Sequence, residues 1–144
     1  MEISPQSVDD HLATLPDGVR ADMELLDTEI TARTKDASRV LFEGKFWGGS
    51  DQKIIGYGEF RYTNASGKPV EWFMVGLAAQ KNYISMYVNA VDDDGYLLAK
   101  YQDRLGKVKT GSASISFKTV ADIDMDVLME LVGTAGTQLH PHDP

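Results

Sequence analysis

Two lysines lie in a glycine-bounded loop whose residue types suit the binding of a small anion. Residues 106–111 read Gly-Lys-Val-Lys-Thr-Gly, so two glycines enclose four residues, as in a phosphate-binding loop. Such a loop also needs Lys-Ser or Lys-Thr next to the second glycine and a helix whose N-terminus faces the phosphate. Here a serine and an alanine follow and a strand pattern begins. The hypothesis that remains is a site for a small anion at Lys107 and Lys109, where Lys100 and Arg104 would add to the positive electrostatic field. The alternative is a solvated turn that leads into a strand.

Three aspartates further along have the spacing of a calcium-binding loop. Asp122, Asp124 and Asp126 match its first, third and fifth positions, but Val127 stands where glycine is needed and Gly133 where a bidentate glutamate is needed. The calcium interpretation is rejected for this reason. We expect instead that Asp122 caps a helix and that the next two aspartates offset its dipole.

The histidines and the strand aromatics give weaker signals. His11 lies beside the apolar stripe of a predicted helix, where packing is expected, and two further histidines near the C-terminus form a loose metal-binding candidate. No set of serine, histidine and carboxylate has local support for hydrolysis. Four aromatic residues of the predicted strands are candidates for a ligand-binding or dimer surface, with packing as the alternative. These residues are Tyr57, Trp72, Tyr83 and Tyr87.

Composition limits the classes of protein that fit. The chain has 144 residues, is 42% hydrophobic and has no cysteine, so one domain without disulfides or thiolate metal sites is expected. The net charge is −8, with −5 over residues 1–39 and −5 over residues 122–144. An acidic surface repels a phosphate backbone, so nucleic-acid binding is not expected. The absence of a secretory signal and of a long apolar run predicts a cytoplasmic protein without membrane contact.

The apolar spacing predicts four helices. The first is expected from Ser4-Pro5 to about Leu15, and the second from the turn at residues 16–18 to Thr34 or Lys35, with apolar residues every three or four positions. A short third helix is expected over residues 98–105, and a fourth begins near Asp122. Residues 1–132 would form the domain, and residues 133–144 a mobile tail.

An alternating pattern between the second and fourth helices predicts a sheet of about five strands. Short turns between the early strands favour antiparallel pairing. One face should pack against the helices, and the other should be open and rich in tyrosine and serine. The fold class is therefore α+β, a two-layer sandwich with the helices on one face of the sheet. The expected strands cover residues 40–47, 53–62, 69–79, 83–89 and 112–118.

The order of several sequence blocks resembles the YdhG-like bacterial domains of unknown function, the DUF1801 family. The blocks are residues 8–16, 55–62, 72–81, 105–111 with the following strand, and 120–131, which together span most of the domain. The resemblance implies a compact α+β domain without an established activity. One branch of the family is connected with frataxin-like iron delivery, in which acidic helix residues hold iron weakly.

Two hypotheses follow for the function, and neither names a catalytic residue. The first is a weak iron-binding or carrier role, which rests on the resemblance and on the acidic N-terminal third. The second is a module that binds a small molecule or a partner protein through the tyrosine-rich sheet face and the Lys107/Lys109 loop, with a homodimer through that face as one form. The candidate iron ligands are Asp9, Asp10, Asp22, Glu24, Asp27 and Glu29.

Overall fold

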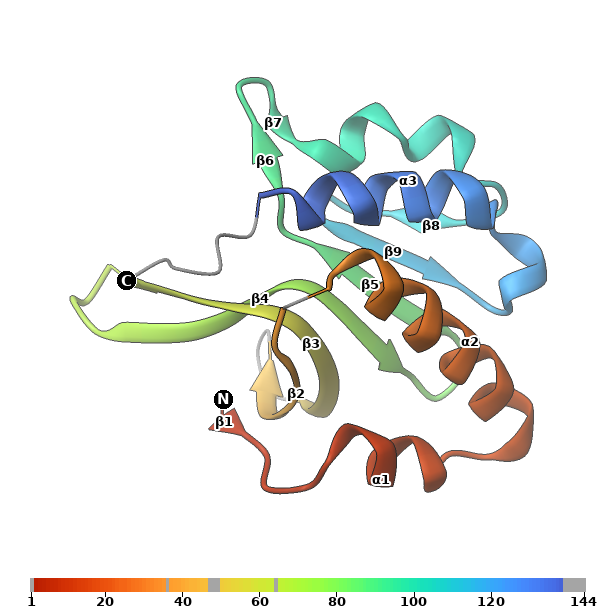
Figure 1. The fold of residues 1–144 in the computed structure, drawn as a ribbon, viewed down its shortest axis with the longest axis horizontal. Helices are drawn as coiled ribbons and strands as arrows, with labels where there is room; N and C mark the ends of the chain where they lie inside the picture. The colour runs from red at the N-terminus through yellow and green to blue at the C-terminus, as the bar shows by residue number, and fades with distance from the viewer. Residues whose placement is uncertain (1, 36, 47–49, 64, 139–144) are drawn as a thin grey trace.

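A seven-stranded antiparallel sheet runs through the described part of the molecule, and the helices lie against one of its faces (Figure 1). The computed structural model describes residues 2–35, 37–46, 50–63 and 65–138. The strand order in the sheet is β1-β2-β3-β4-β5-β9-β8, and β6 and β7 form a separate hairpin. The strands are β1 (Glu2–Ile3), β2 (Arg39–Phe46), β3 (Ser50–Thr63), β4 (Pro69–Ala79), β5 (Ile84–Val88), β6 (Val91–Asp92), β7 (Gly95–Tyr96), β8 (Lys109–Thr110) and β9 (Ser114–Phe117).

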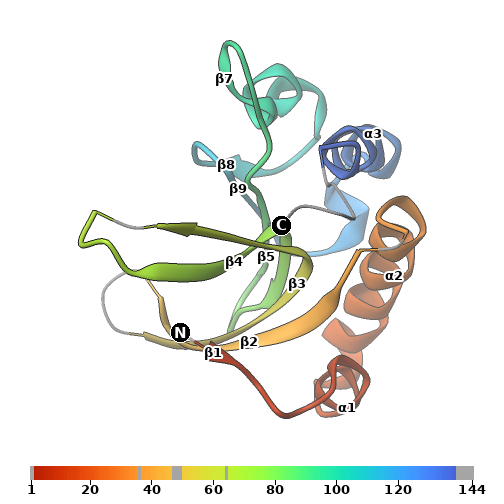
Figure 2. The same ribbon diagram turned by 60° about the vertical axis from the view of Figure 1, so that its left-hand side comes forward.

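The predicted α+β sandwich is confirmed, and its five predicted strands correspond to β2, β3, β4, β5 and β9. The strands that the sequence did not reveal, β1, β8, β6 and β7, have two residues each. Two residues are too few to show a hydrophobic period, so such strands are recognised only by their partners. Figure 2 shows the sheet curving away from the helices, with the long β3–β4 hairpin projecting from it.

The helices differ from their predicted bounds at the ends. The α-helices are α1 (Val8–Ala13), α2 (Asp17–Arg33) and α3 (Met125–Gly136). The start at Ser4-Pro5 was wrong because the Ser4 amide donates to the Leu41 carbonyl of β2, and Ser7 caps α1 instead. The predicted second helix is confirmed as α2. The third is two short 3₁₀ helices, η1 (Leu97–Lys100) and η2 (Gln102–Arg104).

The predicted C-terminal helix begins earlier in the sequence than α3 and also ends earlier than α3. Asp122 closes a third 3₁₀ helix, η3 (Val120–Asp122), while the Asp124 side chain accepts from the Val127 amide and caps α3. Residues 133–136, expected in a mobile tail, belong to α3, and Ala135 there is fully buried. The histidines at 140 and 142 lie outside the described residues.

The main core lies between the helices and the sheet. Met23, Leu26 and Ile30 of α2 repeat at helical spacing and are all fully buried. Ile84, Met86 and Val88 of β5 alternate in sequence and face the same core, as their period of two predicts. Each fully buried aliphatic side chain of this kind contributes about 1.5–3 kcal/mol relative to exposure.

The opposite face of the sheet carries a smaller core, which we call the aromatic cluster and define as Phe42, Trp72, Phe73 and Tyr87. The Phe73 ring lies 5.4 Å from Phe42, 4.6 Å from Trp72 and 6.2 Å from Tyr87, measured between ring centroids. Such separations are typical of favourable aromatic pairs. The expected open tyrosine-rich face is therefore partly closed by its own rings.

Space for these rings comes from two glycines that pair across β3 and β4. Gly56 and Gly76 are register partners. A Cβ at Gly56 would lie 2.5 Å from a Phe42 ring carbon, and one at Gly76 would lie 2.4 Å from a Phe73 ring carbon. Because both distances are far below a van der Waals contact, any side chain at these positions would displace the rings.

Substitution at the glycine pair should therefore destabilise the protein. Gly56→Ala and Gly76→Ala are each expected to lower the free energy of unfolding by about 1–3 kcal/mol through overpacking. Gly18→Ala is the matched control, because a Cβ there meets nothing within 4 Å. Urea unfolding measures the difference. If all three variants were equally stable, the packing of the aromatic rings would not depend on the absence of a Cβ atom at the glycine pair.

His11 of α1 is a second unusual feature of the fold. The residue is 6% exposed, and neither ring nitrogen has a hydrogen-bond partner among the residues that the structure describes. Burial lowers the pKa of His11 below 6.5, the Lys53 charge lowers it further, and the Glu43 charge acts in the opposite direction. The neutral ring is therefore the form that packs in the folded protein, as expected for a core histidine.

Stability should fall on mild acidification for this reason. As pH drops through 6.5, the unfolded chain binds a proton at His11 that the folded protein does not yet accept, so the free energy of unfolding decreases. The loss at pH 5.5 is at most about 1.4 kcal/mol. Urea unfolding at about pH 7.5 and pH 5.5 measures it, and His11→Phe should abolish most of the difference. If the variant lost as much free energy of unfolding between the two pH values, the loss would arise from a group other than His11.

Candidate ligand-binding site

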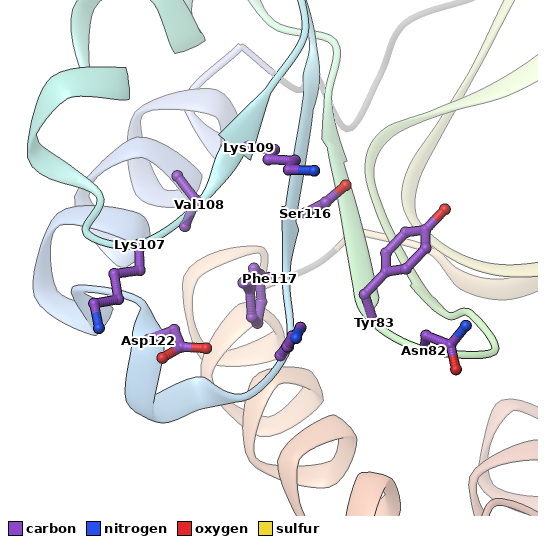
Figure 3. A pocket seen from close by; sticks show the side chains of 9 residues that line it. Asn82, Tyr83, Lys107, Val108, Lys109, Ser116, Phe117 and Asp122 are labelled. Atoms are coloured by element: carbon purple, nitrogen blue, oxygen red, sulfur yellow. The ribbon is translucent and has the colours of Figure 1, made fainter.

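An open pocket of about 730 Å³ lies at the edge of the sheet where β8 leaves β9 (Figure 3). It brings together three of the six predicted ligand-binding residues, Tyr83, Lys107 and Lys109. The volume is in the range of small-molecule sites. The pocket is lined by Asn82, Tyr83, Lys107, Val108, Lys109, Ser116, Phe117, Lys118 and Asp122.

The pocket exists because the chain before β8 diverges from β9. Lys109 pairs with Ser116, but the preceding residues turn away and pair with the segment before α3. There the Lys107 amide donates to the Asp122 carbonyl at 2.8 Å, and the Asp124 amide donates to the Leu105 carbonyl at 2.8 Å. The two lysines of the loop are thus held by β9 at one end and by the start of α3 at the other.

Gly106 makes this second attachment sterically possible. Its φ of +96° lies in the region that favours glycine, and a Cβ there would lie 2.6 Å from the Asp122 carbonyl oxygen. Gly106 also forms a bridge with Ile123. The glycine that suggested a phosphate-binding loop in the sequence is therefore needed for the close approach of two backbone segments, which positions Lys107.

Strand alternation places several polar side chains on one face of the site. Lys109 and Ser116 are register partners, and Lys118 lies two residues after Ser116, so these side chains share a face. The register of β5 and β9, continued by one residue beyond the strands, sets Tyr83 opposite Lys118. Tyr83 is 45% exposed, whereas Phe117 is 4% exposed and belongs to the main core, so it contributes only a small apolar surface to the pocket.

The charge of the pocket is positive in an otherwise acidic protein. The ammonium groups of Lys107, Lys109 and Lys118 form no ion pair or hydrogen bond with any residue that the structure describes. The described lining residues supply three positive charges against the carboxylate of Asp122. An anion entering this pocket would meet cations that have no competing partner in the described part of the chain.

The other two cations that the sequence suggested do not contribute in this way. Lys100 pairs with Asp92 and, at 3.4 Å, with Asp94 in the β6–β7 hairpin. Arg104 lies 3.6 Å from Glu130 and stacks over the Tyr101 ring. Lys118 supplies the third charge instead. In the sequence, Lys118 alternates with Ser114 and Ser116. This alternation indicates that the three side chains share a face of the strand, but it does not show how far Lys118 lies from Lys107.

The remaining predicted ligand-binding residues lie elsewhere. Trp72 and Tyr87 belong to the aromatic cluster on the second face of the sheet. Tyr57 is 1% exposed and belongs to the main core, so its expected place on an open face was wrong. The predicted surface is therefore divided between a pocket, a packed cluster and a buried residue.

Tyr57 is instead part of a buried polar group around Asp27 of α2. The Asp27 carboxylate accepts from the Tyr57 hydroxyl at 2.6 Å and from the Arg39 guanidinium at 3.0 and 2.6 Å. Burial and the Asp27 charge raise the pKa of Tyr57 well above 10, and the hydrogen bond to Asp27 raises the pKa of Arg39. Asp27 is 8% exposed, and these donors occupy its carboxylate.

The other candidate iron ligands are distributed over the helix surfaces. The Asp9 carboxylate contacts Arg39 at 3.0 Å, Asp22 accepts from the Val120 amide at 3.2 Å, and Glu29 pairs with Arg33 at 2.6 Å. Asp10 and Glu24 are exposed. Within residues 2–35, 37–46, 50–63 and 65–138, no three histidine or carboxylate side chains form a group that could hold a metal ion.

A structural role for Asp27 predicts a large effect on stability. Asp27→Asn should lower the free energy of unfolding by about 2–3 kcal/mol, because Arg39 would lose its buried partner. Asp9→Asn is the control, since Asp9 contacts the same arginine but its side chain is 83% exposed, and its loss should stay below about 1 kcal/mol. If both substitutions had similar effects on urea unfolding, the proposed structural role of Asp27 would be contradicted.

Comparisons with protein-family models, with curated protein sequences and with solved structures found no match for this chain. The resemblance to the YdhG-like domains therefore stays a prediction from the sequence blocks. In the described part of the chain, no helix combines the length and the apolar character that a bilayer span requires.

Proposed function

We propose that this protein is a small-molecule binding module whose site is the pocket over the Lys107/Lys109 loop. The ligand carries an anionic group, which the lysines attract, and an apolar part, which rests on Phe117 and Val108. The observation that carries the proposal is that three lysines without an ion pair or hydrogen bond to any described residue line one pocket.

The charge distribution of the chain supports selective rather than general attraction of anions. The net charge is −8, so polyanions are repelled over most of the surface, while the pocket offers a local concentration of positive charge. A concave site focuses this field and raises the local concentration of a small anion. Binding at the pocket would accordingly weaken with ionic strength.

The neutral polar groups of the lining favour recognition of an oxyanion. The side-chain amide of Asn82 and the hydroxyls of Tyr83 and Ser116 can each donate a hydrogen bond. Val108 is half-buried, and together with Phe117 it provides the apolar contact that small-molecule sites use for affinity. A non-catalytic binding role in the cytoplasm needs no group beyond these.

Weak iron binding by the acids of α1 and α2 is a separate hypothesis, which rests on the sequence resemblance. Asp27 and Glu29 already have basic partners, and none of the described contacts gathers the other acids. A homodimer through the second face of the sheet likewise stays a prediction. The pocket is the better supported site because three of the candidate ligand-binding residues line it together, whereas no described group of the candidate iron ligands could hold a metal ion.

Titration of the ¹⁵N-labelled protein with a panel of small aromatic and aliphatic oxyanions tests the proposed function. Amide shifts should concentrate on residues 107–109 and 116–118. Tyr83→Ala should weaken binding of aromatic members roughly three- to tenfold by removing one wall of the pocket. Tyr96→Ala is the matched control, because Tyr96 is 43% exposed on the separate β6–β7 hairpin and Tyr83 is 45% exposed. Shifts spread evenly over the surface, or equal losses in both variants, would contradict the proposal.

A further inference from the structure

We infer that the anionic group bound in this pocket is a dianion, namely the phosphate of a small organic phosphate monoester. The inference rests on the proposed function and assigns the chemical class of its ligand. Three observations carry it: the charge balance of the lining, the number of donors that separate segments supply, and a backbone amide that has no acceptor among the described residues where β8 and β9 separate.

The charge balance of the lining matches two negative charges. Lys107, Lys109 and Lys118 carry three positive charges, and Asp122 carries one negative charge. A phosphate monoester has a charge of about −1.5 to −2 at pH 7, whereas a carboxylate has −1. A monocarboxylate would leave excess positive charge in the pocket, so the dianion gains more from the same site.

The donors of the lining come from several segments of the chain. Lys107 and Lys109 belong to the loop and to β8, and Tyr83 precedes β5 (Figure 3). Lys118 follows β9 and lines the same pocket. A phosphate group has three terminal oxygens that accept from donors in different directions, and a carboxylate has two oxygens in one plane. Lysine is a common phosphate ligand because its ammonium acts as a point charge without a fixed plane.

A backbone amide adds a further donor where the strands separate. Val88 donates to Ala113, and Gly111 donates to Ser114, so alternate residues of β9 turn their backbone groups toward β5 and toward β8. By this alternation, the amide of Lys118 faces the β8 side, beyond the last β8 residue. No acceptor for it occurs among the residues that the structure describes. An oxyanion in the pocket would satisfy this donor.

A small ester fits the site better than a nucleic-acid backbone. The three lysines line a single pocket at the edge of the sheet, whereas backbone binding uses a basic stripe along several phosphates. The first and last segments of the chain each carry −5 and would repel a long polyanion. Phe117 and Val108 provide a surface for the organic part of the ester.

Titration at constant ionic strength with phenyl phosphate, benzoate and inorganic phosphate tests the inference. Phenyl phosphate should bind roughly tenfold more tightly than benzoate, because one additional charge-assisted contact has about that effect. It should also bind more tightly than inorganic phosphate, which lacks the ring. The affinity for phenyl phosphate should fall as pH decreases below about 6, where the dianion takes up a proton.

Lysine variants test whether the preference for phenyl phosphate over benzoate arises in the pocket. Lys109→Ala and Lys118→Ala should each weaken phenyl phosphate roughly three- to tenfold and reduce its advantage over benzoate. Lys81→Ala is the matched control, because Lys81 is exposed near Tyr83 but does not line the pocket. Equal losses in all three variants would show a general charge effect and would overturn the inference.

The other outcomes separate the two proposals. Equal binding of benzoate and phenyl phosphate, with shifts at residues 107–109 and 116–118, would overturn the dianion assignment and leave the proposed function intact. Absence of such shifts with every compound, here and with the oxyanion panel, would overturn both. A short single-stranded oligonucleotide binding more tightly than phenyl phosphate would replace the small ester with a nucleic acid and would also overturn the inference.

Discussion

The buried carboxylate of Asp27 fixes how the long helix α2 sits on the sheet. Arg39 and Tyr57 are register partners on β2 and β3, and both donate to Asp27. A buried carboxylate without donors would be strongly unfavourable, so α2 must lie where these two strands present their polar groups. The same arginine reaches Asp9 on α1. The buried Asp27 carboxylate therefore connects α2 to two neighbouring strands, and the apolar core packs within that arrangement.

The two kinds of charge in this protein have different roles. Several acids near the N-terminus contact arginines or backbone amides and stabilise the helices on the sheet, as Asp9, Asp22 and Asp27 do. The lysines around the pocket have no such contacts among the described residues. The net charge is therefore a poor guide to the candidate site: the protein has an excess of acidic residues, but the charged side chains that line the pocket without a partner among the described residues are basic.

Part of the candidate site was predictable from the sequence. Lys107 and Lys109 are close together in the chain, and the alternation around residues 83 and 116 predicted the faces of β5 and β9. Lys118 and Asp122 were not predictable as neighbours of that loop, because a strand, a turn and a 3₁₀ helix separate them from it in sequence. Tyr57 illustrates the opposite error. Its strand position was recognised, but burial beside Asp27 depends on a helix 30 residues earlier.

By itself, the sequence determined the α+β class, the five longer strands and the apolar faces of α2 and α3. These features depend on local periodicity, which neighbouring residues encode completely. Only the tertiary structure decided which charges are paired, which aromatic rings are covered, and where the backbone leaves a pocket. Those outcomes depend on contacts between distant segments, such as Gly106 with Asp122 and Gly56 with Phe42. A single sequence records the residue types in such contacts but not their distances.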